Sequence, residues 1–311
     1  MIHKKKMNFK LQTCLVLLCI QFVSGQNSPV EQENTEDYLS SGYYEVVYKA
    51  DSLFLTRNYR QSFELLHGLF QKMEPINMYI YYELETYTAS AYKVGNKEIA
   101  YENLQNLVSE HGLTWRQIKK DSILSSIALE SGLDSLRFMQ MRKTYEATIN
   151  MDLREQIRQM KRSDQLYRGK SYMENLEKQD SIDISNGRAL KVIFEKYGYP
   201  GKELIGHSTA EERVMMDPIL LHMKDSVMEH YFLPKLLEFV KKGTCDPKTY
   251  GAVADKLTMM KSLDQSRFYG TFRGMDERLP PVEVLNRNRK SIGLPRYGYE
   301  EWRFNYLYKR P

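Results

Sequence analysis

Cysteine is nearly absent from this 311-residue sequence, which has three, two of them within the first 25 residues. Cys245 is the only cysteine after that point, so an intramolecular disulfide is excluded from the rest of the chain. We interpret Cys245, at a junction between a loop and a helix, as an unreactive thiol. The remaining ~285 residues must be stabilised by an ordinary hydrophobic core, and that length suffices for one or two domains.

The apolar run near the N-terminus is too short to span a membrane. Leu11–Val23 has 13 residues, whereas a spanning helix needs ~20. Four lysines precede this run, and small residues at Ser24-Gly25 allow cleavage before Gln26. These features predict a signal peptide over residues 1–25. We therefore expect an exported product, periplasmic or extracellular, with no transmembrane segment in the mature chain.

The mature chain also has almost no net charge. The four lysines of the predicted signal peptide account for most of the formal charge of +5, and without them 41 basic residues face 40 acidic ones. Such a balance provides no field that would attract nucleic acid or an anionic membrane. We therefore expect no nucleic-acid partner.

Strong catalytic motifs are missing as well. The sequence has no Gly-rich phosphate loop ending in Lys-Ser/Thr, no Gly-x-Ser-x-Gly, no His-Glu-x-x-His and no Cys-x-x-Cys. Each absence removes a common class of enzyme. The sequence therefore predicts no cofactor and no metal ion, and whether the protein is an enzyme stays open.

The first part of the mature chain shows paired helical patterns. Residues 26–40 are polar and acidic, which predicts a disordered spacer. In residues 41–141, Asn58 and Asn96 mark equivalent turns 38 positions apart, and each is followed four residues later by a small residue, Ser62 or Ala100. This pattern resembles the tetratricopeptide (TPR) repeat, although Arg57 stands where glycine is usual.

The rest of the chain predicts a second helical region. Residues 142–168 predict one connecting helix, and residues 169–311 a mainly helical domain. Within that domain the sequence predicts helices over 188–197, 217–231, 233–240, 247–260 and 282–291. Alternating aromatic and polar residues over 266–282 predict a short β-hairpin. The expected fold class is mainly α, with TPR-like helical hairpins followed by a helical domain that carries a short β-hairpin.

Polar, glycine and proline residues spread over 155–297 form a recognisable pattern. They are Asp164-Gln165, Arg168, Asp183, Asn186, Gly198-Tyr199-Pro200, Gly206, His222, Asp255-Lys256, Gln265, Tyr269-Gly270-Thr271, Pro281, Asn286, Arg289 and Gly293-Leu294. This pattern resembles a family of uncharacterised exported bacterial proteins, of the Bacteroidetes type, whose C-terminal domain has no assigned function and is often preceded by degenerate helical repeats. The resemblance implies architecture and compartment but no activity. This chain departs from the family pattern at Lys256, where arginine is usual, and at Phe272, where glutamine is usual.

His222 is the best candidate for chemistry. On a continuous helix over 217–231 it would lie outside the apolar arc, beside Asp225, Ser226 and Glu229. A histidine beside carboxylates suits general acid–base catalysis or a metal site. The same arrangement is typical of a solvated helix flank, and we favour that interpretation from the sequence.

A second group of polar residues could converge on His222. Asp164 and Arg168 are four apart with the acid first, which favours a surface ion pair on a helix. They could instead line a polar cleft that binds a carboxylate or a sugar. Asp255 and Gln265 are the remaining candidates for such a site. By contrast, we interpret Asp180, Asp183 and Asn186 as helix-capping residues.

The aromatic tail over 296–310 has two interpretations. Its rings could stack on sugars or cover a partner, but packing against the protein's own surface is more typical.

The sequence thus leaves two functional hypotheses. The first is an exported interaction protein whose helical repeats bind a protein, a peptide or an envelope glycan. The second is a periplasmic hydrolase with a site around His222, Asp164 and Arg168. Close approach of these three side chains in a concave pocket would favour the enzyme.

Overall fold

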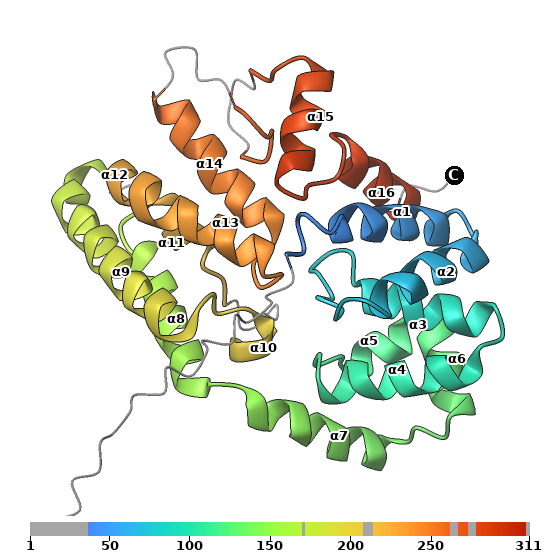
Figure 1. The fold of residues 1–311 in the computed structure, drawn as a ribbon. Coiled ribbons are helices and arrows are strands. Elements are labelled where there is room, and N and C mark those ends of the chain that lie inside the picture. The colour runs from blue at the N-terminus through green and yellow to red at the C-terminus, as the bar shows by residue number, and fades with distance from the viewer. Residues whose placement is uncertain (1–36, 170–171, 208–213, 262–266, 273–277, 309–311) are drawn as a thin grey trace, which may run out of the picture. The chain divides into compact units, whose positions relative to one another are not determined.

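The first helices form two antiparallel hairpins. The computed structural model describes residues 37–169, 172–207, 214–261, 267–272 and 278–308. The predicted signal peptide and most of the predicted spacer therefore lie outside the described residues. Figure 1 shows α1 (Tyr43–Leu55), α2 (Tyr59–Phe70), α3 (Glu83–Lys93) and α4 (Lys97–Ser109) packed in chain order.

Small residues bring these helices close together, as the repeated pattern predicts. Ser62 is fully buried, and its hydroxyl donates to the Ala50 carbonyl of α1 and accepts from Ser90 of α3. Arg57 adopts the left-handed conformation, with φ of 66°, in the turn equivalent to that of Gly95. The two hairpins are thus alike in their turns, whereas their assignment to the TPR class stays a prediction.

Four further helices follow. They are α5 (Trp115–Lys120), α6 (Ser122–Glu130), α7 (Ser135–Thr148) and α8 (Met151–Asp164). Asp121 and Asp134 cap α6 and α7 by accepting hydrogen bonds from backbone N–H groups of the first turn.

The remaining helices are mostly short. They are α9 (Leu176–Tyr197), α10 (Lys202–Ile205), α11 (Asp217–Leu221), α12 (Asp225–Val227), α13 (Leu233–Lys241), α14 (Pro247–Lys261), α15 (Val282–Ser291) and α16 (Tyr299–Tyr308). A 3₁₀ turn, Met173–Asn175, precedes α9, and a π-helical turn, Met228–Phe232, joins α12 to α13. The mainly α fold class is confirmed.

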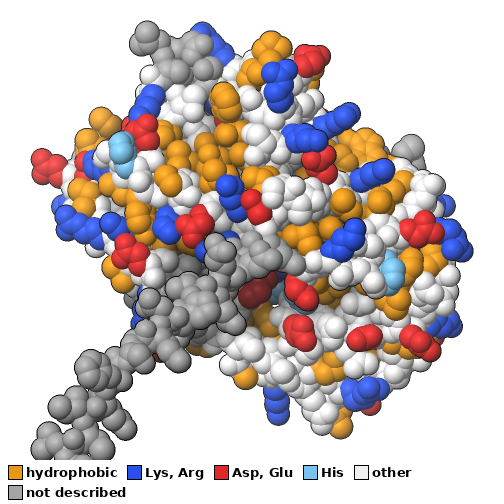
Figure 2. All heavy atoms as spheres, viewed as in Figure 1, with side chains coloured by type: hydrophobic (Ala, Val, Ile, Leu, Met, Phe, Trp, Pro, Cys, Tyr) orange, Lys and Arg blue, Asp and Glu red, His pale blue; other side chains and the backbone are white. Residues whose placement is uncertain are grey.

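One hydrophobic core runs through most of these helices, from Tyr43 on α1 to Leu257 on α14. The described helices belong to a single compact unit, Thr35–Pro311. Tyr44 of α1 donates a hydrogen bond to the Val240 carbonyl, and Tyr48 donates one to the Gly293 carbonyl. On the face shown in Figure 2, basic and acidic side chains are interspersed, in keeping with the balanced charge.

The predicted connecting helix over 142–168 is interrupted. α7 ends at Thr148 and α8 begins at Met151. The Asn150 side chain accepts from the Leu153 N–H, while the Asn150 N–H donates to the Leu204 carbonyl. Asn150 therefore caps a new helix instead of continuing the old one.

Three other predictions of local structure need correction. The helix predicted over 217–231 ends at Leu221 and resumes at Asp225. Asp180, Asp183 and Asn186 lie inside α9 and cap nothing. The spacer predicted over 26–40 does not extend through its last four residues, because the Asp37 side chain accepts from Leu39 and Ser40 N–H groups in a turn and Tyr38 bonds the Lys241 carbonyl.

The β-hairpin predicted over 266–282 is not confirmed. The described part of that segment contains no strand, and residues 266 and 273–277 lie outside the description. A single backbone hydrogen bond joins the Arg267 N–H to the Arg278 carbonyl. The N–H groups of Phe268, Tyr269 and Thr271 bond a side chain, Asp255, instead of a neighbouring strand.

Among the described helices, none is both long and apolar enough to cross a membrane.

Two glycines allow a direct test of the helix packing. Gly68 lies in α2, and a Cβ atom there would meet nothing within 4 Å. Gly68→Ala should therefore raise the free energy of unfolding by about 0.5–1 kcal/mol, since alanine restricts the unfolded chain. Gly293 has φ of +81° and its Cβ would lie 2.5 Å from the Tyr44 ring, so Gly293→Ala should destabilise the protein. Urea unfolding of both variants measures these changes in the free energy of unfolding. Equal changes of the same sign would contradict the packing described around Gly68 and Gly293.

Candidate functional site

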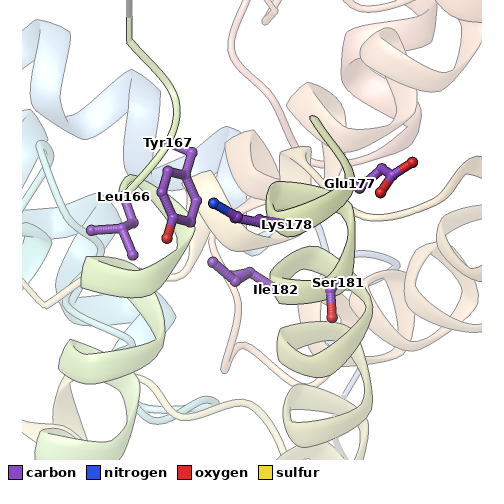
Figure 3. A pocket seen from close by; sticks show the side chains of 6 residues that line it. All are labelled: Leu166, Tyr167, Glu177, Lys178, Ser181 and Ile182. Carbon is purple, nitrogen blue, oxygen red and sulfur yellow. The ribbon is translucent and has the colours of Figure 1, made fainter. Parts of the chain in front are cut away.

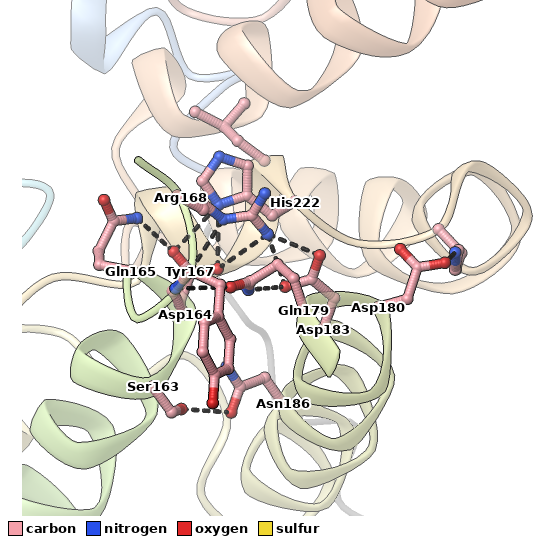
Figure 4. A network of polar contacts seen from close by, with 12 residues as sticks. Ser163, Asp164, Gln165, Tyr167, Arg168, Gln179, Asp180, Asp183, Asn186 and His222 are labelled. Atoms are coloured by element: carbon pink, nitrogen blue, oxygen red, sulfur yellow. Dashed lines mark hydrogen bonds and ion pairs between the residues drawn. The ribbon is translucent and has the colours of Figure 1, made fainter. Parts of the chain in front are cut away.

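The structure brings His222, Asp164 and Arg168 together. Asp164 is the last residue of α8, Arg168 lies in the turn that follows, and His222 directly follows α11. Figure 4 shows the three side chains meeting between the end of α8 and the N-terminal half of α9. Close approach, one of the two conditions that would favour an enzyme, is therefore present in the structure.

The contact between Asp164 and His222 is a buried hydrogen bond. His222 Nδ1 lies 2.9 Å from Oδ1 and 3.0 Å from Oδ2 of Asp164. The Asp164 side chain has no exposed surface, whereas the His222 side chain is 29% exposed. Because an ionised carboxylate can only accept, Nδ1 carries a proton, and Nε2 is the basic nitrogen whenever the ring is neutral. Nε2 has no hydrogen-bond partner among the described residues.

The surroundings of Asp164 keep it ionised. Burial acts to raise the pKa of Asp164, but the hydrogen bond and charge of His222 oppose this, together with Gln165 and Arg168. The net effect is a pKa below the ordinary value of an aspartate. Asp164 thus places a negative charge next to Nδ1 of the His222 imidazole.

The guanidinium group of Arg168 forms its closest ion pair with a second carboxylate, that of Asp183. Its terminal nitrogen lies 2.5 and 2.6 Å from the two oxygens of Asp183 and 3.6 Å from Oδ1 of Asp164. Its Nε donates to the Asp164 carbonyl, 2.9 Å away. Gln179 of α9 also donates, both to the Asp164 carbonyl and to Asp183. Arg168 and Gln179 therefore hold the end of α8 against α9.

Asn186 extends this network one turn further along α9. Its side chain donates to the Met160 carbonyl of α8 and accepts from Ser163. Six of the residues that carry the family resemblance thus meet in one polar network: Asp164, Gln165, Arg168, Asp183, Asn186 and His222. The sequence predicts helix capping for Asp183 and Asn186 and does not place them in this network, because an acid and an amide three residues apart are also typical of helix starts.

Lys256 is a further cationic neighbour that sequence reasoning did not select. Its ammonium group, on α14, donates to the Leu221 carbonyl at the end of α11. Burial lowers the pKa of Lys256, with the charge of Asp225 acting against this and that of Arg168 adding to it. Lys256 holds the turn that carries His222, and its charge suits the exposed carbonyls of a helix C-terminus.

The environment predicted for His222 on its own helix is wrong. α11 ends at Leu221, so the arc that would place His222 beside Asp225, Ser226 and Glu229 does not exist. Glu229 instead forms an ion pair with Lys261. The partner of His222 comes from 58 residues earlier in the chain.

A shallow pocket of about 430 Å³ lies beside the network, between the end of α8 and the start of α9. Figure 3 shows its lining, formed by Leu166, Tyr167, Glu177, Lys178, Ser181 and Ile182. The backbone N–H of Tyr167 donates to Gln179, so this pocket and the network share a wall. His222, Asp164 and Arg168 do not line it.

Asp255 has a structural role away from His222. Its buried carboxylate accepts hydrogen bonds from the N–H groups of Phe268, Tyr269, Thr271 and Phe272 and from the Thr271 hydroxyl. All of these donors belong to the segment after α14. Asp255 is therefore fully occupied in holding that segment, and the prediction that it joins His222 is wrong. Gln265 lies outside the described residues.

The arrangement can move a proton at Nε2 of His222. A buried carboxylate fixes the tautomer and orientation of the ring, and the outer nitrogen remains accessible to water or a substrate hydroxyl. No cluster of three or more His, Cys, Asp or Glu side chains that could hold a metal ion occurs in the part of the chain that the structure describes.

Comparisons with known proteins add no assignment. No family model, no curated protein and no solved structure matches this chain. The resemblance to exported proteins of unknown function stays a prediction.

Asp255 gives the sharpest test of structure around the site. Asp255→Ala leaves one buried and three partly buried N–H groups without their acceptor, so it should lower the free energy of unfolding by roughly 3 kcal/mol. Asp180→Asn is the matched control, because the Asp180 side chain is 47% exposed and its ion pair with Lys224 is worth little. Chemical denaturation of both variants checks this. A loss below 1 kcal/mol for Asp255→Ala would contradict the assigned role.

Proposed function

We propose that the protein is an exported hydrolase in which His222 is the general base. The observation that supports this proposal is the pairing of His222 Nδ1 with the buried Asp164 carboxylate, which leaves Nε2 accessible and unpaired within the described structure. Nε2 bonds no serine or cysteine side chain among the described residues, so we assign the attack to a water molecule.

In the proposed reaction, Nε2 removes a proton from a water molecule as that water attacks the substrate. The ring becomes an imidazolium, which the negative charge of Asp164 stabilises. Arg168 and Gln179 are positioning residues, because both donate hydrogen bonds to the Asp164 backbone carbonyl and so hold Asp164 in place. The imidazolium then returns the proton to the leaving group.

Replacement of His222 tests the proposal. His222→Ala should reduce hydrolysis by about 10²–10⁴-fold, the range typical of a lost general base. Asp164→Asn should cause a loss of similar order, since the amide removes the charge behind the ring. A panel of chromogenic esters, amides, glycosides and phosphodiesters provides the assay.

His230→Ala is the matched control for that panel. The His230 side chain is 76% exposed, and its ring bonds the Ser226 carbonyl of its own helical turn. Acylation by diethyl pyrocarbonate, located by mass spectrometry, reports on Nε2 without any substrate. The proposal fails if Asp164→Asn leaves both acylation of His222 and hydrolysis unchanged.

A second candidate function is binding of a protein, a peptide or an envelope glycan by the N-terminal helices. A groove of about 630 Å³ supports it, within the range of ligand-binding pockets. Its lining combines apolar side chains, among them Val46 of α1 and Leu65 of α2, with polar ones. The lining residues are Asp37, Ser40, Ser41, Val46, Glu64, Leu65, Gly68, Leu69, Lys72 and Met73.

Gly68 offers a way to close this groove. Since a side chain at Gly68 would enter open space, Gly68→Trp should fill the groove without disturbing the helix, whereas Gly68→Ala leaves it open. Calorimetric titration with peptidoglycan fragments should then show binding by wild type and Gly68→Ala, but not by Gly68→Trp. Equal binding by all three would place the ligand elsewhere.

A further inference from the structure

The last helix, α16, lies on the N-terminal helices without being buried by them. None of its ten residues is buried. Trp302, Phe304, Leu307 and Tyr308 are all exposed, Tyr308 by 71%. Gly298, directly before the helix, has φ of +84° and open space around its Cβ position.

Two side chains of α16 meet one carboxylate on α1. The Tyr299 hydroxyl lies 2.7 Å and the Arg303 Nε 2.9 Å from Oδ2 of Asp51. Tyr299 also bonds the backbone carbonyl of Tyr48. Asp51 is only 2% exposed, so this contact removes a charge from water.

Aromatic rings surround the contact. Tyr299 lies beside the Tyr48–Tyr81 ring pair, with ring centroids 6.2 and 6.3 Å away. The Arg303 guanidinium lies over the Tyr81 ring, 5.6 Å from its centroid. The site on the N-terminal helices therefore combines the Asp51 carboxylate with a pair of tyrosine rings, which suits a guanidinium together with a phenol.

The negative charge of the buried Asp51 is compensated by side chains of α16. Burial raises the pKa of Asp51 above the ordinary value, although Arg303 and Tyr299 both act to lower it. Among the described residues, the other ion pair of α16 joins Glu300 to Lys248, and it contributes little because both side chains are partly exposed. The attachment of α16 is thus concentrated on Asp51.

We propose that Asp51, Tyr48 and Tyr81 form a binding site for a helical segment that presents Tyr and Arg four residues apart, and that α16 is its built-in competitor. Residues at positions i and i+4 share one face of a helix, as Tyr299 and Arg303 do, so both can reach a single carboxylate. The partner is a peptide segment of this chemistry, which displaces α16. This proposal is independent of the chemistry at His222.

In the described structure, α16 engages one of the two carboxylate oxygens of Asp51. The hydrogen bonds of Tyr299 and Arg303 both go to Oδ2, and Oδ1 of Asp51 has no partner among the described residues. An arginine that engages both oxygens in a bidentate pair binds more tightly than one that engages a single oxygen. A partner segment that makes this pair gains a contact that α16 lacks, which opposes the advantage that α16 has from its covalent attachment.

A peptide in trans tests this proposal on the full chain. The probe is a fluorescein-labelled synthetic peptide with the sequence of residues 296–308, and fluorescence anisotropy reports its binding. The Tyr299→Phe/Arg303→Ala variant has a weakened internal competitor. It should bind the peptide at least tenfold more tightly than wild type does, and addition of Asp51→Asn should abolish that binding.

Two controls make the result specific. A peptide in which Arg303 is replaced by Glu should bind none of these chains, but it should bind a chain that carries Asp51→Arg. Circular dichroism establishes that each variant retains its helices, so that lost binding reflects the site. The proposal is overturned if the variant with the weakened competitor does not bind the peptide. It is also overturned if wild type binds equally well or if Asp51→Asn has no effect.

Discussion

A carboxylate that is removed from water must find its donors inside the protein, and this constraint organises the structure at three places. Asp51 takes a hydroxyl and a guanidinium from the last helix, Asp164 takes an imidazole from 58 residues later, and Asp255 takes backbone N–H groups from the segment after α14. In each case the donors come from another element. The buried acids therefore fix which segments lie next to one another, whereas apolar contacts alone would tolerate other arrangements.

The local rules of helix formation were readable in the sequence. Asp121 and Asp134 cap helices where acids precede helical periodicity, and α15 covers the residues predicted for it. The failures arose where a side chain acted over long range. Asn150 ends one helix and caps another because Leu204 bonds its backbone, and α11 ends at Leu221, whose carbonyl bonds Lys256. No periodicity within 142–168 or 217–231 carries that information.

The candidate site was predictable in its members but not in its geometry. The pattern of acids, an arginine and a histidine selected Asp164, Arg168 and His222, which do meet. A helical wheel gave His222 the wrong partners, because the wheel assumed a helix that tertiary contacts interrupt. Asp255 looked equivalent to Asp164 in sequence. The structure distinguishes the two acids. Asp255 accepts hydrogen bonds from the backbone N–H groups of a loop, whereas Asp164 accepts one from the His222 imidazole.

The hydrogen bonds that join α1 to the distant half of the chain also set the order of folding. Tyr44 and Tyr48 bond carbonyls that lie 196 and 245 residues later. Closure of such long loops is entropically costly and comes late, so local hairpins form first. During synthesis the first helix must wait for residues that the ribosome adds near the end. A nascent chain of this protein therefore stays incompletely folded until its C-terminal helices have emerged.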